Sequence, residues 1–293
     1  MLNAFSVDVE DYFQVNAFEG SISRASWSSF EPRVERNTRR LLDLCAEHGV
    51  RGTFFTLGWV ADRWPGLVRE IRDAGHELAT HGQDHRRVTT MTPGQFREDL
   101  RRSKRTIEDA AGVEVIGFRA PSYSIVRETM WAVDVLIEEG FHYDSSIFPI
   151  HHDRYGIPVS PRHPYVLSRP PASIVEAPGS TVKWGPFNLP VGGGGYFRIL
   201  PYGWTRWGIR RLNEFEKLPA IFYLHPWEID PDQPRLSAGR LSRFRHYRNL
   251  EKTEDRLRAL LREFRFSTMM SLLHGQIREM RAEVGAASLP YVW

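Results

Sequence analysis

Four short polar clusters in this sequence contain the residue types that metal-assisted hydrolysis requires. They are Asp8-Val9-Glu10-Asp11, His81-Gly82-Gln83-Asp84-His85, Arg119-Ala120-Pro121-Ser122-Tyr123 and Leu224-His225-Pro226-Trp227-Glu228. Two imidazoles and one carboxylate can bind a divalent metal and leave positions open for water and substrate. The remaining carboxylates and histidines suit the roles of general base and general acid. The residue types therefore indicate a hydrolytic site that uses a metal.

The spacing within two clusters supports this interpretation. Asp8 and Glu10 are two residues apart, so their side chains point the same way if the backbone stays extended. His81 and His85 are four residues apart, a spacing that brings both rings to one side of a helical turn. Taken alone, each cluster has an ordinary structural explanation: a solvated strand end, a surface arginine or a core histidine. A common site is favoured because all four would otherwise have to meet by accident.

Each cluster follows a segment whose pattern predicts a strand. Short apolar or β-branched runs predict strands at 3–9, 52–57, 76–80, 114–119, 141–144, 220–224 and 265–268. Helical spacing with terminal Gly or Pro predicts helices at 32–48, 65–74, 93–111, 127–139, 203–217, 251–263 and from 269 to about 283. This alternation is typical of a parallel α/β sheet or a (β/α) barrel, whose active sites form at the carboxyl ends of the strands.

The middle of the chain departs from this alternation. Residues 149–195 contain nine prolines and the run Gly192-Gly193-Gly194-Gly195, which predicts loops and irregular β segments. We expect these residues to form a groove wall or lid. The sequence contains no internal repeat and no low-complexity linker. It predicts one domain over 1–293, with an irregular β/loop insertion at about 149–200 and an extension at about 200–285.

Composition excludes several classes of protein. The chain of 293 residues is 41% hydrophobic and 26% charged, as in globular proteins. Its net charge is +3 and only four of its 39 basic residues are lysines; no basic block with interleaved aromatics stands out, which argues against nucleic-acid binding. The N-terminus lacks the pattern of a signal peptide, so we expect a cytoplasmic protein, with membrane surfaces open as partners. A single cysteine, Cys45, excludes an intramolecular disulfide.

The ordered combination of His81 and His85, Arg-x-Pro at 119–121 and Leu-His at 224–225 resembles the NodB-type polysaccharide deacetylases, carbohydrate esterase family 4. The resemblance covers residue 3 to about 270. The Asp-Val-Glu-Asp-Tyr-Phe start, GGGGYFR at 192–198 and FYLHPWE at 222–228 are similar to a branch with a C-terminal extension that is associated with exopolysaccharide systems. The resemblance implies a distorted (β/α) barrel of the NodB type.

The resemblance also implies roles for single residues. Asp8 matches the general base, and Arg119 matches the arginine that orients it. His81 and His85 match two metal ligands. His225 matches the general acid. Asp144, in Tyr-Asp-Ser-Ser, matches the aspartate that holds this histidine in its tautomer.

Two positions depart from the family pattern. Val9 stands where most members have a second aspartate, so the third metal ligand must be Glu10 or Asp11, and the strand alternation favours Glu10. Ser145 stands where many members carry a tryptophan that lines the substrate groove. Substrate contacts are therefore expected from four residues: Pro121, Tyr123, Trp227 and Tyr196.

These expectations describe a metal-dependent N-deacetylase of N-acetylated amino sugars in a polysaccharide or lipid-linked glycan. Zinc is the expected metal, with cobalt or nickel as alternatives. A lipid-linked substrate would allow peripheral membrane association, and the oligomeric state is left open. One alternative is a hydrolase of small cyclic amides such as allantoin, on the same fold. The other is a carbohydrate-binding barrel without catalysis.

Overall fold

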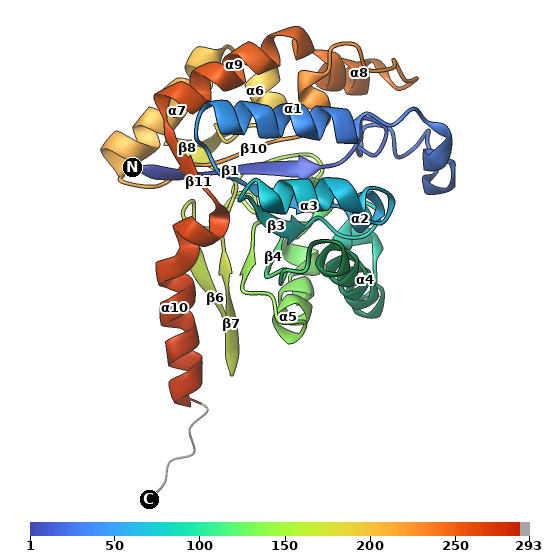
Figure 1. The fold of residues 1–293 in the computed structure, drawn as a ribbon. Helices are drawn as coiled ribbons and strands as arrows, with labels where there is room; N and C mark the ends of the chain where they lie inside the picture. The colour runs from blue at the N-terminus through green and yellow to red at the C-terminus, as the bar shows by residue number, and fades with distance from the viewer. Residues whose placement is uncertain (288–293) are drawn as a thin grey trace, which may run out of the picture.

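The computed structural model describes residues 1–287, with side chains described as far as residue 280. Its core is a mostly parallel sheet with helices packed around it (Figure 1). The strand order is β10-β1-β2-β3-β4-β5-β7-β6, and β11 pairs with β1 outside this path. The strands are β1 (Leu2–Val9), β2 (Thr53–Thr56), β3 (Glu77–Thr80), β4 (Gly117–Phe118), β5 (Tyr143–Asp144), β6 (Tyr165–Arg169), β7 (Ala172–Glu176), β10 (Ile221–Leu224) and β11 (Arg265–Ser267). A separate hairpin pairs β8 (Thr181–Trp184) with β9 (Phe187–Pro190).

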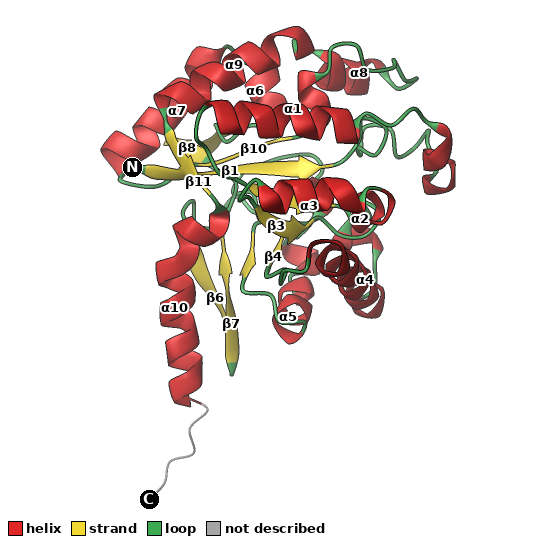
Figure 2. Ribbon diagram, in the orientation of Figure 1, coloured by secondary structure: helices red, strands yellow, loops and turns green. Residues whose placement is uncertain are grey.

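Helices alternate with most of the parallel strands, and most of them cover the outer face of the sheet, whereas α10 packs against the opposite face (Figure 2). They are α1 (Val34–Glu47), α2 (Gly58–Arg63), α3 (Pro65–Asp73), α4 (Pro93–Ala111), α5 (Trp131–Glu138), α6 (Gly194–Ile199), α7 (Tyr202–Arg210), α8 (Arg240–Tyr247), α9 (Leu250–Glu263) and α10 (Met269–Ala287). The α/β class predicted from the alternating pattern is confirmed.

The first strand shows how the sheet positions polar groups. Phe5, Val7 and Val9 belong to the core between the sheet and the outer helices. Ala4 points to the opposite face, where it packs with the start of α10. Because side chains alternate along a strand, Asp8 lies on this inner face too, at the carboxyl end of β1. The parallel register pairs Val7 with Leu224 of β10, so Asp8 near the end of β1 and His225 just after β10 lie at the same level on adjacent strands.

Several elements differ from the sequence prediction. The strand expected at 114–119 is reduced to two residues in β4, and the helix expected at 203–217 continues from α7 as a π-helical segment, Arg211–Glu216. Short helices α2, α6 and α8 were not predicted, because each is too short for a periodic pattern to stand out. The irregular β structure expected within 149–200 is present as β6 to β9. The boundaries of the insertion and extension remain predictions.

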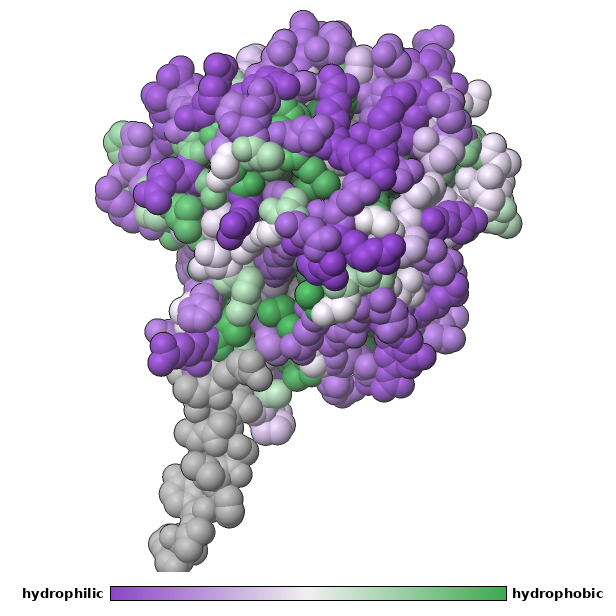
Figure 3. Space-filling model, viewed as in Figure 1, coloured by the Kyte–Doolittle hydropathy of each residue, from purple (hydrophilic) through white to green (hydrophobic). Residues whose placement is uncertain are grey.

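The surface in the view of Figure 3 is mostly hydrophilic, with apolar side chains exposed in small groups between the helices. Among the described residues, no helix is both long and apolar enough to cross a membrane.

One buried histidine should make folding stability depend on pH. His76 precedes β3, and its Nδ1 accepts a hydrogen bond from the Gly52 N–H at 3.0 Å. Burial lowers its pKa from 6.5 to about 4. The folded protein therefore favours neutral imidazole. The contribution of neutral His76 to the free energy of unfolding is complete above pH 6.5 and is lost as the pH falls towards 4.

The free energy of unfolding should be lower at pH 5 than at pH 7.5. We expect this loss to be about 1–2 kcal/mol larger in wild type than in His76→Asn. Asparagine keeps an acceptor but cannot titrate. Urea denaturation at both pH values measures the difference. Equal losses in the two proteins would show that His76 does not titrate in this window.

Candidate active site

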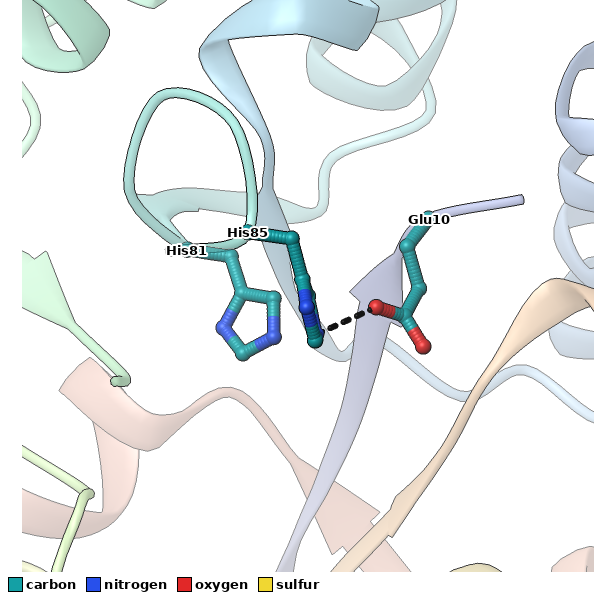
Figure 4. Close-up of side chains that lie close together, drawn as sticks. All are labelled: Glu10, His81 and His85. Atoms are coloured by element: carbon teal, nitrogen blue, oxygen red, sulfur yellow. Dashed lines mark ion pairs between the residues drawn. The ribbon is translucent and has the colours of Figure 1, made fainter. Parts of the chain in front are cut away.

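Three buried side chains converge at the carboxyl ends of β1 and β3. Glu10, His81 and His85 each offer one ligand atom, and these atoms lie within 4.8 Å of one another. Figure 4 shows the two imidazoles side by side with the Glu10 carboxylate facing them. His85 Nε2 lies 2.8 Å from Glu10 Oε2. The donor set and its closeness fit a divalent metal ion with open coordination positions.

A loop rather than a helix brings the two histidines together. His85 has a φ of 54° and Gly82 a φ of 79°, so the segment cannot be helical as the four-residue spacing suggested. The backbone N–H groups of Gly58 and Trp59 bind the carbonyls of Gly82 and Gln83 and hold the loop against α2. Left-handed backbone at a non-glycine residue such as His85 is strain of the kind that concentrates at functional sites.

The surroundings of His81 select its protonation state. Its Nδ1 lies 2.8 Å from the carbonyl oxygen of Arg119. A carbonyl can only accept, so Nδ1 carries the proton and Nε2 keeps a lone pair for a metal. Burial holds the pKa of His81 well below its usual value, which keeps the ring neutral. Burial alone would raise the pKa of Glu10, but the charges of His85 and His225 lower it. A neutral imidazole and an ionised carboxylate are the forms that bind metals.

Asp8 lies beside this triad and is held by Arg119. Arg119 Nη1 donates to Asp8 Oδ1 at 2.7 Å and to Ser6 Oγ at 2.9 Å. The guanidinium is completely buried and lies 4.1 Å from the centre of the Phe55 ring. Its Nη2 donates to Ser145 Oγ at 3.0 Å. Asp8 is thus fixed at a buried position, and a carboxyl group there is chemically suited to the role of proton acceptor.

His225 approaches the same carboxylates from β10. Its Nε2 lies 3.7 Å from Asp8 Oδ2 and 3.6 Å from Glu10 Oε1. Its Nδ1 lies 2.6 Å from Glu228 Oε1, and Glu228 Oε2 forms an ion pair with the buried Arg198. Burial alone would lower the pKa of His225, but the nearby carboxylates, Glu10 and Glu228 foremost, raise it to about 9. A protonated imidazole at neutral pH can act as a general acid.

The structure corrects the predicted partner of His225. The expected partner of His225, Asp144, instead accepts a hydrogen bond from Ser146 and lies beside Glu176, its register neighbour on β7. Burial raises the pKa of Asp144 to about 6 and that of Glu176 well above its usual range. Two buried carboxyls side by side retain a proton because both cannot ionise at low cost. The structure therefore assigns the orienting contact with His225 to Glu228.

Two segments of the chain are similar in sequence to known protein families. Residues 22–136 match the polysaccharide deacetylase family, and residues 145–274 match a domain of unknown function, DUF3473. The similarity to the polysaccharide deacetylase family therefore covers residues 22–136. It is 32% identical over 114 residues to a peptidoglycan deacetylase of Helicobacter pylori and 26% identical over 98 residues to a peptidoglycan-N-acetylglucosamine deacetylase of Bacillus cereus. These matches cover 39% and 33% of this chain and 37% and 36% of the relatives, so each spans about a third of the relative's length.

Solved structures share the fold over nearly the whole chain. A Mycobacterium smegmatis protein assigned to the polysaccharide deacetylases superposes with a TM-score of 0.63 at 23% identity, covering 96% of this chain and 91% of that one. The PuuE allantoinase superposes with a TM-score of 0.58 at 18% identity, covering 99% and 92%. The polysaccharide deacetylase fold expected from the sequence is confirmed.

A pocket of about 210 Å³ opens above Glu10, His81 and His85. Asp8 and Glu10 both line it, as the strand alternation predicted. So do Tyr123 and Trp227, two of the four residues expected to contact substrate. The segment expected as a groove wall contributes His152, Arg154 and Tyr155 to the lining.

The other residues predicted to bind lie away from the pocket lining. Pro121 is buried in a 3₁₀ turn, and Tyr196 packs edge-on against Phe148 behind the wall. Asp11, the alternative metal ligand, accepts hydrogen bonds from the backbone N–H groups of Arg33 and Val34 at 2.7 and 2.9 Å. It caps the start of α1, which explains why it does not join Glu10. Burial raises the pKa of Asp11 to about 6.

Three residues that support the site were not predicted from the sequence. Glu228 stands three residues after His225 at the start of a 3₁₀ turn, Pro226–Ile229, and its Oε1 also accepts the His225 N–H at 3.0 Å. This is the spacing of a capping box and could have indicated the contact. Ser145 supports Arg119 in place of lining the groove. Arg198 lies within the quoted GGGGYFR segment, but no local pattern connects it with Glu228.

Proposed function

We propose that this protein is a metal-dependent N-deacetylase that removes the acetyl group from N-acetylated amino sugars. One observation carries the proposal: a single pocket holds three buried metal-ligand side chains, a carboxylate held by Arg119 and a histidine held by Glu228. Amide hydrolysis needs a proton acceptor for water, a proton donor for the amine and a cation at the carbonyl oxygen. The names of the relatives support the same reaction.

Glu10, His81 and His85 would hold the metal. A bound divalent ion would polarise the acetyl carbonyl and acidify the attacking water. Imidazole suits zinc, cobalt and nickel, and we propose zinc. The buried ligand set and the protonation state imposed on His81 by Arg119 favour binding of such an ion.

The protein's own groups then move two protons. Asp8 accepts a proton from the attacking water, whose oxygen bonds to the acetyl carbon. As the C–N bond breaks, His225 Nε2 gives its proton to the leaving nitrogen, so that the products are acetate and a free amine. Arg119 keeps Asp8 in place, and Glu228 fixes His225 with Nδ1 protonated and Nε2 towards the pocket.

We propose a polysaccharide or lipid-linked glycan as the substrate, made in exopolysaccharide biosynthesis. The aromatic side chains of Tyr123, Tyr155 and Trp227 in the pocket wall favour a sugar ring, because aromatic faces pack against apolar ring surfaces. The similarity of the Asp8 and FYLHPWE segments to the exopolysaccharide-associated branch supports this choice over a mature cell-wall substrate.

The test is release of free amine and acetate from N-acetylglucosamine oligomers, with zinc, cobalt or nickel supplied in turn. We expect turnover that is lost on chelation and restored by one of these ions. Allantoin is assayed in parallel. Turnover of allantoin alone would replace the proposal with a cyclic-amide hydrolase. Calorimetric binding of the oligomers without amine release under any metal would replace it with a binding barrel.

Metal content distinguishes the two carboxylates that the sequence offered. We expect about one divalent ion per chain in wild type and its loss in Glu10→Ala and His81→Ala. Asp11→Ala should retain the ion, because Asp11 caps α1, and lose stability of about 1 kcal/mol. Elemental analysis after dialysis, with thermal melting, measures both quantities. Retention in Glu10→Ala with loss in Asp11→Ala would reverse the assignment.

A further inference from the structure

The segment 235–248, which contains α8, has an unusual charge. It holds five arginines at 235, 240, 243, 245 and 248, and residues 233–250 contain no aspartate or glutamate. Among the described residues only Arg245 of these five forms an ion pair, at 3.8 Å from Asp153. Arg235 lies over the Tyr247 ring at 4.4 Å and Arg248 over Phe244 at 5.8 Å. This block leaves uncompensated positive charge on one short surface element.

The same helix exposes apolar side chains. Leu241 is 60% and Phe244 is 50% exposed, and they are three residues apart, so they share one side of α8. Large apolar side chains exposed beside arginines are typical of helices that lie at the boundary between water and lipid. A soluble anionic polymer would match the charge but would offer no apolar phase for Leu241.

The inner side of α8 forms part of the active-site wall. His246 is buried and stacks on Trp227 at 4.2 Å, and Trp227 Nε1 donates to Glu10 Oε1 at 3.1 Å. Arg245 and His246 line the pocket, whereas Arg243 and Phe244 line an adjoining groove on the outside. In Figure 1, α8 lies at the upper right, on the side towards which β1 points. A surface bound to this helix would therefore lie next to the pocket mouth.

We propose that α8 and its flanking arginines dock this protein on an anionic lipid bilayer. Leu241 and Phe244 would enter the headgroup region, and the arginines would contact lipid phosphates. This docking does not depend on the proposed deacetylase activity, but it would bring the pocket to a lipid-linked glycan of the kind proposed above. The charge complementarity and the exposed apolar pair together favour lipid over a soluble polyanion.

The experiment is co-sedimentation of the full chain with vesicles of phosphatidylcholine alone or with about 30% phosphatidylglycerol. We expect binding only to the anionic vesicles, weakened roughly tenfold or more in R240Q/R243Q and also in L241S/F244S. The matched control is R105Q/R127Q, which removes two exposed arginines from α4 and the turn before α5, far from α8, and should bind like wild type. Thermal melting confirms that each variant is folded.

Three results would overturn the proposal. The first is no binding to anionic vesicles, and the second is unchanged binding in both α8 variants. The third is wild-type behaviour of L241S/F244S combined with displacement by a soluble anionic polysaccharide, which would assign the arginines to glycan recognition. All variants are also assayed on soluble N-acetylglucosamine oligomers. Because none of the four α8 residues lines the catalytic pocket, a failure of docking is separable from a failure of the proposed activity.

Discussion

Asp8→Asn should lower kcat by a factor on the order of 10²–10⁴ while the metal stays bound. Asparagine keeps the size of the side chain but cannot accept the proton of the attacking water. Asp8 is outside the group of three side chains that offer metal ligand atoms, so the metal content should not change. The measurements are steady-state kinetics of amine release and elemental analysis on the same preparation.

The control for this variant is Ser6→Ala. It removes another hydrogen bond of Arg119, at 2.9 Å, without touching the proton acceptor. We expect it to keep most of the activity. If Ser6→Ala were as inactive as Asp8→Asn, the loss would come from a displaced Arg119 and Asp8 would not be the base. Thermal melting of both variants is needed, because Asp8→Asn leaves the buried Arg119 without its counter-charge.

Glu228→Gln should reduce kcat by a factor on the order of 10²–10⁴, as expected when a catalytic imidazole loses the carboxylate that fixes its tautomer. The pKa of His225 is raised to about 9 with Glu228 among its causes. A group with a raised pKa is protonated below that value, so activity that needs protonated His225 falls as the pH rises past it. Removing the Glu228 charge should move this alkaline fall to lower pH.

The matched comparison is Asp144→Asn, which removes a carboxylate from the residue that the sequence had assigned to this role. Because Asp144 contacts Ser146 and Glu176, we expect less than about a tenfold change in kcat and no shift of the alkaline limb. The pH profile separates positioning from damage to the fold, since a purely structural defect would lower the whole curve. An alkaline shift in Asp144→Asn alone would restore the sequence assignment.

The residues of the site differ in how far the sequence could predict their positions and contacts. The alternation of side chains on β1 is a local property, so the shared side of Asp8 and Glu10 was accessible from spacing alone. The partner of Asp144 was not, because β5 pairs with β7 across about 30 residues of irregular chain, and no pattern sets that register. The helical turn expected for His81 and His85 failed because Gly82 and His85 adopt left-handed backbone, which residue spacing does not report.

The contributions to the site are also spread unevenly along the chain. Asp8 and Glu10 precede the part that matches the polysaccharide deacetylase family, and His225, Glu228 and Arg198 lie in the part that matches DUF3473. Only the two histidines and Arg119 lie within the family match itself. The family match therefore includes three of these eight groups, and the three-dimensional structure is needed to add the others.

The adjacent register of β1 and β10 has a consequence for how this architecture can diversify. Asp8 and His225 each follow one member of the pair Val7 and Leu224, so the distance between these two side chains derives from the repeat between neighbouring strands. Loops such as the one that carries Tyr155 can lengthen, shorten or change sequence without altering that distance. Changes in the loops alone can then accommodate new substrates, while the sheet keeps the distance between Asp8 and His225 constant.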